Sequence, residues 1–335
     1  MQSPLESKWK QITRIEQLPL LFSLVLISVI VGLMSDVFFT LPNWMNIFRA
    51  ASLIAIPAIG MVVLILLGQI DLSIGSVYAL AGVLSVTALN ATESFTVGLL
   101  VAIGIGAVVG LINSIVVVYG KVNSLIATLG MMAIVRGAVL VFTNAGSVRA
   151  NVPGFINFGT GFWGFLPRPL VIAFALFVIV AFLLSRSAIG RHIYSIGGNL
   201  RAAQIAGLPT KSTTIGAFIF ISALAGLSGF IAASRMNSGQ PNAGIGLEFQ
   251  VISAVILGGV SLSGGKGTIS GAMIGVLILG VLTNGLILLN VSSFWQDIVR
   301  GFVIIFAVFI DELRRRNLSD RAYRDAARQL SAKKE

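Results

Sequence analysis

The chain has 335 residues, 56% of them hydrophobic and only 10% charged, whereas soluble domains carry about 25% charged residues. A soluble fold could not cover this much apolar surface, so the composition excludes an ordinary soluble domain and indicates a membrane protein. The net charge of +11 does not point to nucleic acid, because the basic residues lie mainly in short loops and tails, as the positive-inside rule expects.

Apolar runs near the length of a membrane-spanning helix, roughly 20 residues, recur along the whole chain. No cleavable signal pattern precedes the first run, so we interpret it as a permanent span. The sequence predicts an all-α polytopic membrane protein with a single transmembrane domain over residues 1–335 and about ten spans. The predicted spans are Pro19–Phe38, Met45–Leu67, Leu72–Leu89, Phe95–Tyr119, Ser124–Phe142, Leu170–Leu184, Thr213–Ala233, Leu247–Leu262, Thr268–Leu289 and Phe294–Ile310.

The basic residues fall unevenly on the two sides of this ten-span arrangement. One side receives Lys8, Lys10, Arg14, Lys121, Arg186, Arg191, Arg201, Lys211, Lys266 and the tail residues Arg314, Arg315, Arg316, Arg321, Arg324, Arg328, Lys333 and Lys334. The other side receives Arg149, Arg168 and Arg235, with Arg49 and Arg300 near span ends. Under the positive-inside rule, both termini are cytoplasmic and residues 313–335 form a basic cytoplasmic tail.

Two connecting segments are long. Asn144–Pro169 is an outside loop rich in Gly, Asn, Phe and Pro, and residues 185–212 form an inside loop. In the inside loop, Asn199 is a suitable N-cap, and Gly207 followed by Pro209 is a suitable helix stop. This pattern predicts a short cytoplasmic helix, which is either an interfacial linker or a docking helix for a soluble partner.

Glycine patterns suggest close packing near the end of the chain. Gly267, Gly271 and Gly275 lie at a spacing that lets helices approach closely, and packing within the chain is favoured over a dimer face. The segment Leu67–Gly75 is also similar in sequence to Leu257–Gly265, and both lie at turns between predicted spans. Transporters often place broken helices at corresponding positions of internal repeats.

Ionisable residues within apolar sequence are few, and such residues usually mark a pathway or a buried pair. Asp71 either lines the path or caps a helix beginning at Leu72, and capping is favoured. Arg136 lies inside the fifth span and needs a partner, for which Asp71, a backbone carbonyl or a water-filled cavity are candidates. Glu248 and Asp297 lie near outer span ends, where water reaches them, and are weaker candidates.

Neutral polar side chains are more common in the spans than acids, which suits a hydroxyl-rich solute better than an ion. Each such residue can equally be a hydrogen-bonding contact between helices. The neutral polar residues are Gln69, Asn113, Asn123, Asn144, Gln250, Asn284 and Gln296. The predicted substrate path comprises Gln69, Asp71, Arg136, Asn144, Gln250 and Asn284.

The chain lacks the residues of several kinds of active site. It has no cysteine and one histidine, His192, so Cys- or His-rich metal sites are excluded and no cofactor is expected. The segment 259–268 has a P-loop-like Gly-Lys pair, but Val260 takes the place of the first glycine and Gly267 that of the Ser/Thr. We therefore expect no ATPase site and no enzyme activity in this chain.

Several motifs, in order, resemble those of the ribose-type permeases of ATP-binding cassette (ABC) sugar importers, in the branched-chain amino acid and sugar permease superfamily. They are Gly68–Ser76 (GQIDLSIGS), Ile126–Met132 with Arg136-Gly137, Gly197-Gly198-Asn199 with Ala202 and Gly207, Leu257–Thr268, and Asn284-Gly285. The resemblance runs from about the first span to the tenth. The chain departs from the family at Leu200, where Glu is usual, and at Asn123-Ser124, where Gln-Pro is common.

The resemblance implies a vitamin B12-type (type II) importer architecture in the bacterial inner membrane, working with separate partner proteins. The partners would be a second permease copy or a related chain, a cytoplasmic ATPase and a periplasmic sugar-binding protein. The ATPase would dock on the inside loop, at Asn199, Ala202, Ala203 and Gly207. The implied solute is a ribose-like monosaccharide.

Two other functions remain open from the sequence. The chain could be a permease of the same kind for branched-chain amino acids or a sugar-like signal molecule. It could instead be a self-sufficient secondary carrier or channel, although its low content of intramembrane acids argues against a proton relay.

Overall fold

The computed structural model describes residues 17–299, 301–303, 305–306, 308–309 and 312. The predicted basic tail, residues 313–335, lies outside the described residues. So do the N-terminal basic residues Lys8, Lys10 and Arg14, as well as Arg300.

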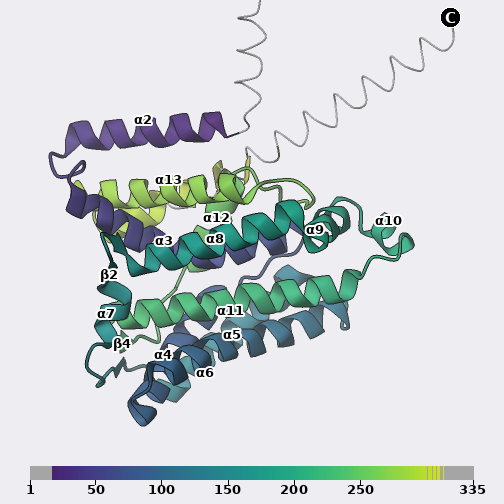
Figure 1. Ribbon diagram of the computed structural model, residues 1–335, viewed down its shortest axis with the longest axis horizontal. Helices are drawn as coiled ribbons and strands as arrows, with labels where there is room; N and C mark the ends of the chain where they lie inside the picture. The colour runs from purple at the N-terminus through teal and green to yellow at the C-terminus, as the bar shows by residue number, and fades with distance from the viewer. Residues whose placement is uncertain (1–16, 300, 304, 307, 310–311, 313–335) are drawn as a thin grey trace, which may run out of the picture.

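Long helices lie side by side along the long axis of the molecule (Figure 1). In chain order they are α2 (Leu18–Met34), α3 (Leu41–Leu66), α4 (Ile74–Thr92), α5 (Phe95–Val118), α6 (Ser124–Thr143), α7 (Phe155–Thr160), α8 (Arg168–Arg186), α9 (Ala188–Gly198), α10 (Leu200–Ile205), α11 (Thr210–Met236), α12 (Leu247–Leu257) and α13 (Ile269–Leu288). Residues 293–299, 301–303, 305–306 and 308–309, which cover the described part of the tenth predicted span, are also helical.

Short strands occur only in loops of the described chain. β1 (Val148–Arg149) pairs antiparallel with β4 (Ser238–Gly239), and β2 (Phe162–Trp163) pairs antiparallel with β3 (Leu166–Pro167). Together with α7 they lie at one end of the helices, whereas α9 and α10 lie at the opposite end (Figure 1).

Seven of the described helices are long and apolar enough to cross a membrane: α3, α4, α5, α6, α8, α11 and α13. The predicted spans Pro19–Phe38 and Leu247–Leu262 are shorter helices, since α2 has 17 residues and α12 has 11. α12 ends early because the chain leaves it through glycines with positive φ, Gly259 at 89° and Gly264 at 82°. A left-handed backbone of this kind favours glycine and cannot continue a right-handed helix.

Glycine allows the helices to pack at backbone distance around α3, which is the most deeply buried span. A Cβ on Gly106 of α5 would overlap the carbonyl oxygen of Ser222 in α11, and one on Gly226 of α11 would overlap that of Ala102 in α5. Gly275 of α13 meets the carbonyl of Ala254 in α12 in the same way. The prediction that the late glycines pack within the chain is confirmed for α13, although Gly267 lies before the helix with a φ of 131°.

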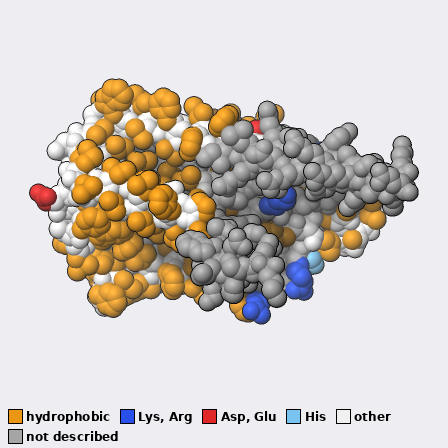
Figure 2. Space-filling view, turned by 90° about the horizontal axis from the view of Figure 1, so that it is seen from above, with side chains coloured by type: hydrophobic (Ala, Val, Ile, Leu, Met, Phe, Trp, Pro, Cys, Tyr) orange, Lys and Arg blue, Asp and Glu red, His pale blue; other side chains and the backbone are white. Residues whose placement is uncertain are grey.

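Several basic residues that the sequence assigns to different sides lie at opposite ends of the described helices, with Arg49 and Arg235 at the end that carries the strands. Arg186, Arg191, Arg201 and Lys211 lie in or next to α9 and α10 at one end, while Arg149 and Arg168 lie near the strands at the other. In Figure 2, basic side chains and the histidine gather toward one end of a largely apolar surface. A bias in the number of Lys and Arg residues between the two ends is what the positive-inside rule expects of a membrane protein.

Candidate functional site

The connection between α3 and α4 is exposed at Gly68 and buried from Asp71 onward, and Asp71 has no exposed surface. One carboxylate oxygen, Oδ1, accepts hydrogen bonds from the backbone N–H and the hydroxyl of Ser73, at 2.8 and 2.6 Å. The other, Oδ2, accepts from Ser222 Oγ of α11 at 3.1 Å and from Asn113 Nδ2 of α5 at 3.3 Å. Asp71 thus joins the turn before α4 to α5 and α11.

The local role of Asp71 resembles the predicted cap, but the helix begins at Ile74 rather than Leu72, and Ser73 is its N-cap residue. Asn113 extends the network, since its Nδ2 also donates to Ser73 Oγ at 2.9 Å. Its Oδ1 is buried without a hydrogen-bond partner among the described residues. These hydrogen bonds form one buried polar network that connects the turn before α4 with α5 and α11.

Arg136 of α6 is bound by backbone carbonyls, one of the partner types considered from the sequence. Its guanidinium donates to the carbonyls of Pro241 and Ala243, at 2.5 and 3.0 Å, and to that of Gly75 at 3.2 Å. The planar fork of arginine suits several acceptors at once. Arg136 therefore fastens α6 to α4 and to the segment between α11 and α12.

Glu248 is buried, contrary to the expectation that water reaches it, with only 5% of its surface exposed. It lies in the first turn of α12, where a carboxylate is stabilised by free backbone N–H groups and the helix dipole. A Cβ on Gly75 would overlap its carboxylate, so Gly75 leaves the room that Glu248 occupies. The sequence could not reveal this, because the contact depends on the packing of α12 against α4.

The neutral residues of the predicted path lie in separate places. Asn284 of α13 and Asn43 of α3 exchange amide hydrogen bonds of 2.9 and 3.0 Å, which links two helices. Gln69 and Gln250 are half-buried, and Asn144 ends α6 with an exposed side chain and a φ of 48°. Their role in a substrate path stays a prediction.

The inside loop contains the predicted short helix, α10. Asn199 caps it by accepting a hydrogen bond from the N–H of Ala202 at 2.9 Å, and Gly207 follows it with a φ of 73°. Ile205 and Leu200 expose 82% and 52% of their surface, whereas Ala203 exposes only 4%. The sequence did not predict the preceding helix α9, which buries Ile193 and Ile196 against the core.

Glycines bring α9, the end of α3 and the loop between α12 and α13 into backbone contact. We name this contact of Leu66, Gly197, Gly264 and Gly265 the glycine junction. Gly265 donates its N–H to the carbonyl of Leu66 at 2.9 Å, and a Cβ on Gly197 would overlap that same carbonyl oxygen. A Cβ on Gly264 would lie 3.0 Å from both the Gly197 carbonyl and the Gly68 nitrogen.

The glycine junction brings together the two similar segments of the sequence, Leu67–Gly75 and Leu257–Gly265. Gly68 in the first segment and Gly264 in the second meet there, so the two turns adjoin in space. Tyr194 of α9 adds a hydrogen bond to the carbonyl of Gly267 at 2.9 Å. Backbone contacts therefore connect α9, through the glycine junction, with the start of the turn that carries Asp71.

Comparison with known proteins gives consistent matches over nearly the whole chain. Residues 43–308 match the family model described as branched-chain amino acid transport system / permease component. The chain is 41% identical to the ribose import permease protein RbsC of Escherichia coli (strain K12) over 300 residues, 88% of this chain and 93% of that protein. No solved structure matches the chain at a significant level.

Two further relatives come from other bacteria. The L-arabinose ABC transporter permease protein AraH of Azospirillum brasilense is 38% identical over 278 residues, 83% of this chain and 82% of that protein. The ribose import permease protein RbsC of Bacillus subtilis (strain 168) is 38% identical over 290 residues, 86% of this chain and 90% of that protein.

Proposed function

The chain belongs to the family of branched-chain amino acid transport system permease components, and on that premise we propose that it is the permease subunit of an ABC importer for a monosaccharide. The observation that carries the proposal is the similarity, along most of the chain, to permeases named for ribose and for arabinose. The neutral amides of the predicted path suit a hydroxyl-rich solute, which agrees with those names.

We propose that a separate ATPase energises transport, because the chain has no P-loop of its own. The exposed apolar side chains of Leu200 and Ile205 on α10 support docking at this helix, since such side chains on a loop otherwise face water without a partner. Leu200 stands where the family usually has an acid, so the contact here would be apolar. Asn199, Ala202 and Gly207 shape the docking helix, and the buried Ala203 anchors it.

The glycine junction supplies a route from the docking helix to the transport path. α9 leads directly into α10, and its Gly197 lies against the carbonyl at the end of α3. We propose that ATPase motion shifts α9 and thereby the turn that carries Gln69 and Asp71. Backbone contacts without intervening side chains transmit such a shift with little slack.

The proposed arrangement in the cell is a type II importer in the bacterial inner membrane, with ten spans per chain and both termini cytoplasmic. The basic residues near α9 and α10 support a cytoplasmic position for that end. α6 exposes Ile126, Ile134 and Val141 and is the least buried of the candidate spans. This face suits a second permease copy, with the path between the two, and a periplasmic binding protein would deliver the sugar.

A permease for branched-chain amino acids is the second candidate, favoured by the description of the matching family model. The periplasmic binding protein of the same transporter distinguishes the two. We expect calorimetric titration of that protein to show binding of a pentose and none of leucine. Binding of leucine but not of pentoses would exclude the sugar assignment while leaving the permease role intact.

The docking role of α10 predicts the effect of Ile205→Asp. A charge at the centre of an apolar contact would cost on the order of 2 kcal/mol, as at other binding hot spots, so the affinity for the ATPase should fall roughly 30-fold. Co-purification of the tagged ATPase with the variant measures this. Ile156→Asp, the same change at an exposed position of α7 at the opposite end, is the control and should retain the ATPase. Equal retention by both variants would argue against docking at α10.

A further inference from the structure

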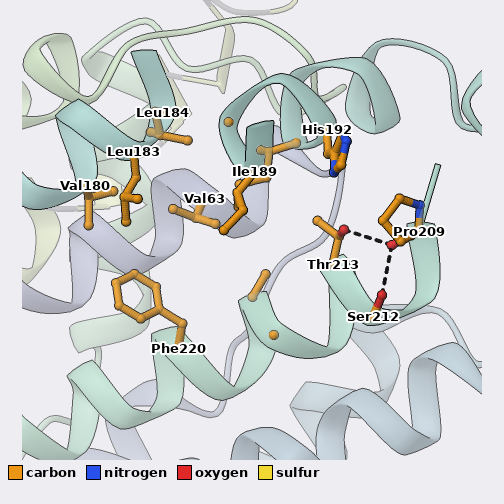
Figure 3. Close-up of a pocket in the computed structure, with 14 residues that line it drawn as sticks. Val63, Val180, Leu183, Leu184, Ile189, His192, Pro209, Ser212, Thr213 and Phe220 are labelled. Atoms are coloured by element: carbon orange, nitrogen blue, oxygen red, sulfur yellow. Dashed lines mark hydrogen bonds between the residues drawn. The ribbon is translucent and has the colours of Figure 1, made fainter. Parts of the chain in front are cut away.

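An open cavity of about 400 Å³ lies between α8 and α11, with α9 closing one end and α3 forming its floor (Figure 3). Its walls are apolar: Val180 and Leu183 of α8, Val63 of α3 and Phe220 of α11. Protein interiors are otherwise packed with few voids larger than a water molecule. An apolar space of this size between helices long enough to cross a membrane is large enough to hold part of a lipid chain.

The cavity exists because α11 carries small residues where it faces α8. A Cβ on Gly216 would meet nothing within 4 Å, whereas Gly226 and Gly229, further along the same helix, contact neighbouring backbone directly. α11 is thus tightly packed in its second half and leaves a groove in its first half.

The end of the cavity beside α9 is polar, and two arginines that do not line it lie near lining residues in the chain. His192 lines it, with the hydroxyls of Ser212 and Thr213 nearby, both of which donate to the carbonyl of Pro209 (Figure 3). Arg186 ends α8 and Arg191 precedes His192 on α9, and both are exposed. The sequence from Arg168 to Met236, which forms three of the four walls, contains no aspartate or glutamate. Arg186 and Arg191 therefore have no acidic partner on α8, α9, α10 or α11.

We propose that the cavity binds an anionic phospholipid, with an acyl chain along the apolar groove and the phosphate near Arg186 and Arg191 beside α9. Of the three long helices in the walls, α8 is the least buried within the chain and is the one that lipid can reach, and clusters of basic residues next to spans attract anionic headgroups. The chain's own tail, residues 313–335, is itself strongly basic, so charge disfavours it as the occupant. The proposal depends on the membrane location of the chain and not on the identity of its solute.

The site has a mechanical consequence, because its wall includes the start of α9. Ile189 and Ile193 line the cavity, and the last turn of the same helix carries Gly197 of the glycine junction. A bound lipid would hold α9 against α8 and α11. It would thereby fix the position of the docking helix α10.

Native mass spectrometry of the purified full-length protein from mixed phosphatidylglycerol and phosphatidylcholine nanodiscs tests the proposal. We expect retained phosphatidylglycerol in roughly fivefold preference or more, the effect of at least one basic side chain at the headgroup. Gly216→Leu should fill the groove and abolish the retained lipid. Gly104→Leu, at another open glycine on α5, is the matched control and should retain it.

The double variant Arg186→Ala/Arg191→Ala changes only exposed side chains, so it tests the headgroup contact without risk to the fold. It should still retain lipid but lose the preference for phosphatidylglycerol. Three results would each overturn the proposal: no lipid on the wild-type protein, equal retention of the two lipids, or unchanged retention in Gly216→Leu. If Gly216→Leu fails to insert, the double variant alone decides, and an unchanged preference in it overturns the headgroup assignment.

Discussion

Gly197→Ala is expected to abolish coupled transport, while Gly198→Ala, one residue away, leaves it intact. A Cβ on Gly197 would overlap the carbonyl oxygen of Leu66 and lie 2.7 Å from the nitrogen of Gly265. Both are backbone atoms, and they form a hydrogen bond with each other. The clash cannot be relieved by a rotamer change, so the junction must open, at a cost of about 1–3 kcal/mol or more.

Gly198 is a close control because it lies next to Gly197 at the end of α9 and receives the same substitution. A Cβ there would meet nothing within 4 Å, so the effect on stability should stay within about 0.5 kcal/mol. Uptake into proteoliposomes and the temperature of aggregation in detergent measure the two variants. Equal uptake by both would show that the glycine junction tolerates displacement and does not link α9 to α3.

Asp71→Leu is expected to remove most of the protein from the membrane fraction, and Asp71→Asn is expected to be much milder. Leucine leaves the Ser73 N–H, the Asn113 amide and the Ser222 hydroxyl without their acceptor in a fully buried site. Each buried group left unsatisfied costs about 1–3 kcal/mol. Asparagine keeps one oxygen acceptor of the same size and can still bind the turn before α4.

The amount of each Asp71 variant in purified membranes, followed by its melting temperature in detergent, separates these cases. We expect Asp71→Asn to insert at a level near the wild type and Asp71→Leu to fall several-fold below it. Equal loss in both variants would show that the negative charge itself is needed. Ser114→Ala, at a buried hydroxyl of α5 that bonds only the carbonyl of Leu111 within its own helix, controls for a general sensitivity of the buried polar residues.

Features that depend on local sequence were predictable. The apolar run Phe95–Tyr119 appears as α5, Phe95–Val118, because a spanning helix needs only length and apolar composition. The Asn199 cap was predictable because a capping side chain binds a backbone N–H only three residues away. The same reasoning overextended the span that begins at Leu247, since the apolar residues after Leu257 continue without a visible break while Gly259 among them takes a φ of 89°.

Features that depend on tertiary contact were not predictable from one sequence. The burial of Glu248 arises because Gly75, far away in the chain, lies against it. Sequence placed Arg136 in a span and left its partner open, and only the fold brings the carbonyls of Pro241 and Ala243 to it. The glycine pattern indicated close packing. Which backbone each glycine contacts, such as that of Leu66 for Gly197, follows only from the arrangement of the helices.

Sugar uptake into proteoliposomes is the most direct test of the proposed function. The liposomes would contain this chain, its ATPase and its sugar-binding protein, with a radiolabelled pentose outside and ATP inside. We predict uptake that requires ATP and all of these components, and that persists in the presence of a proton ionophore. ATP-independent uptake by this chain alone, or uptake that collapses with the ionophore while ATP stays constant, would contradict the account.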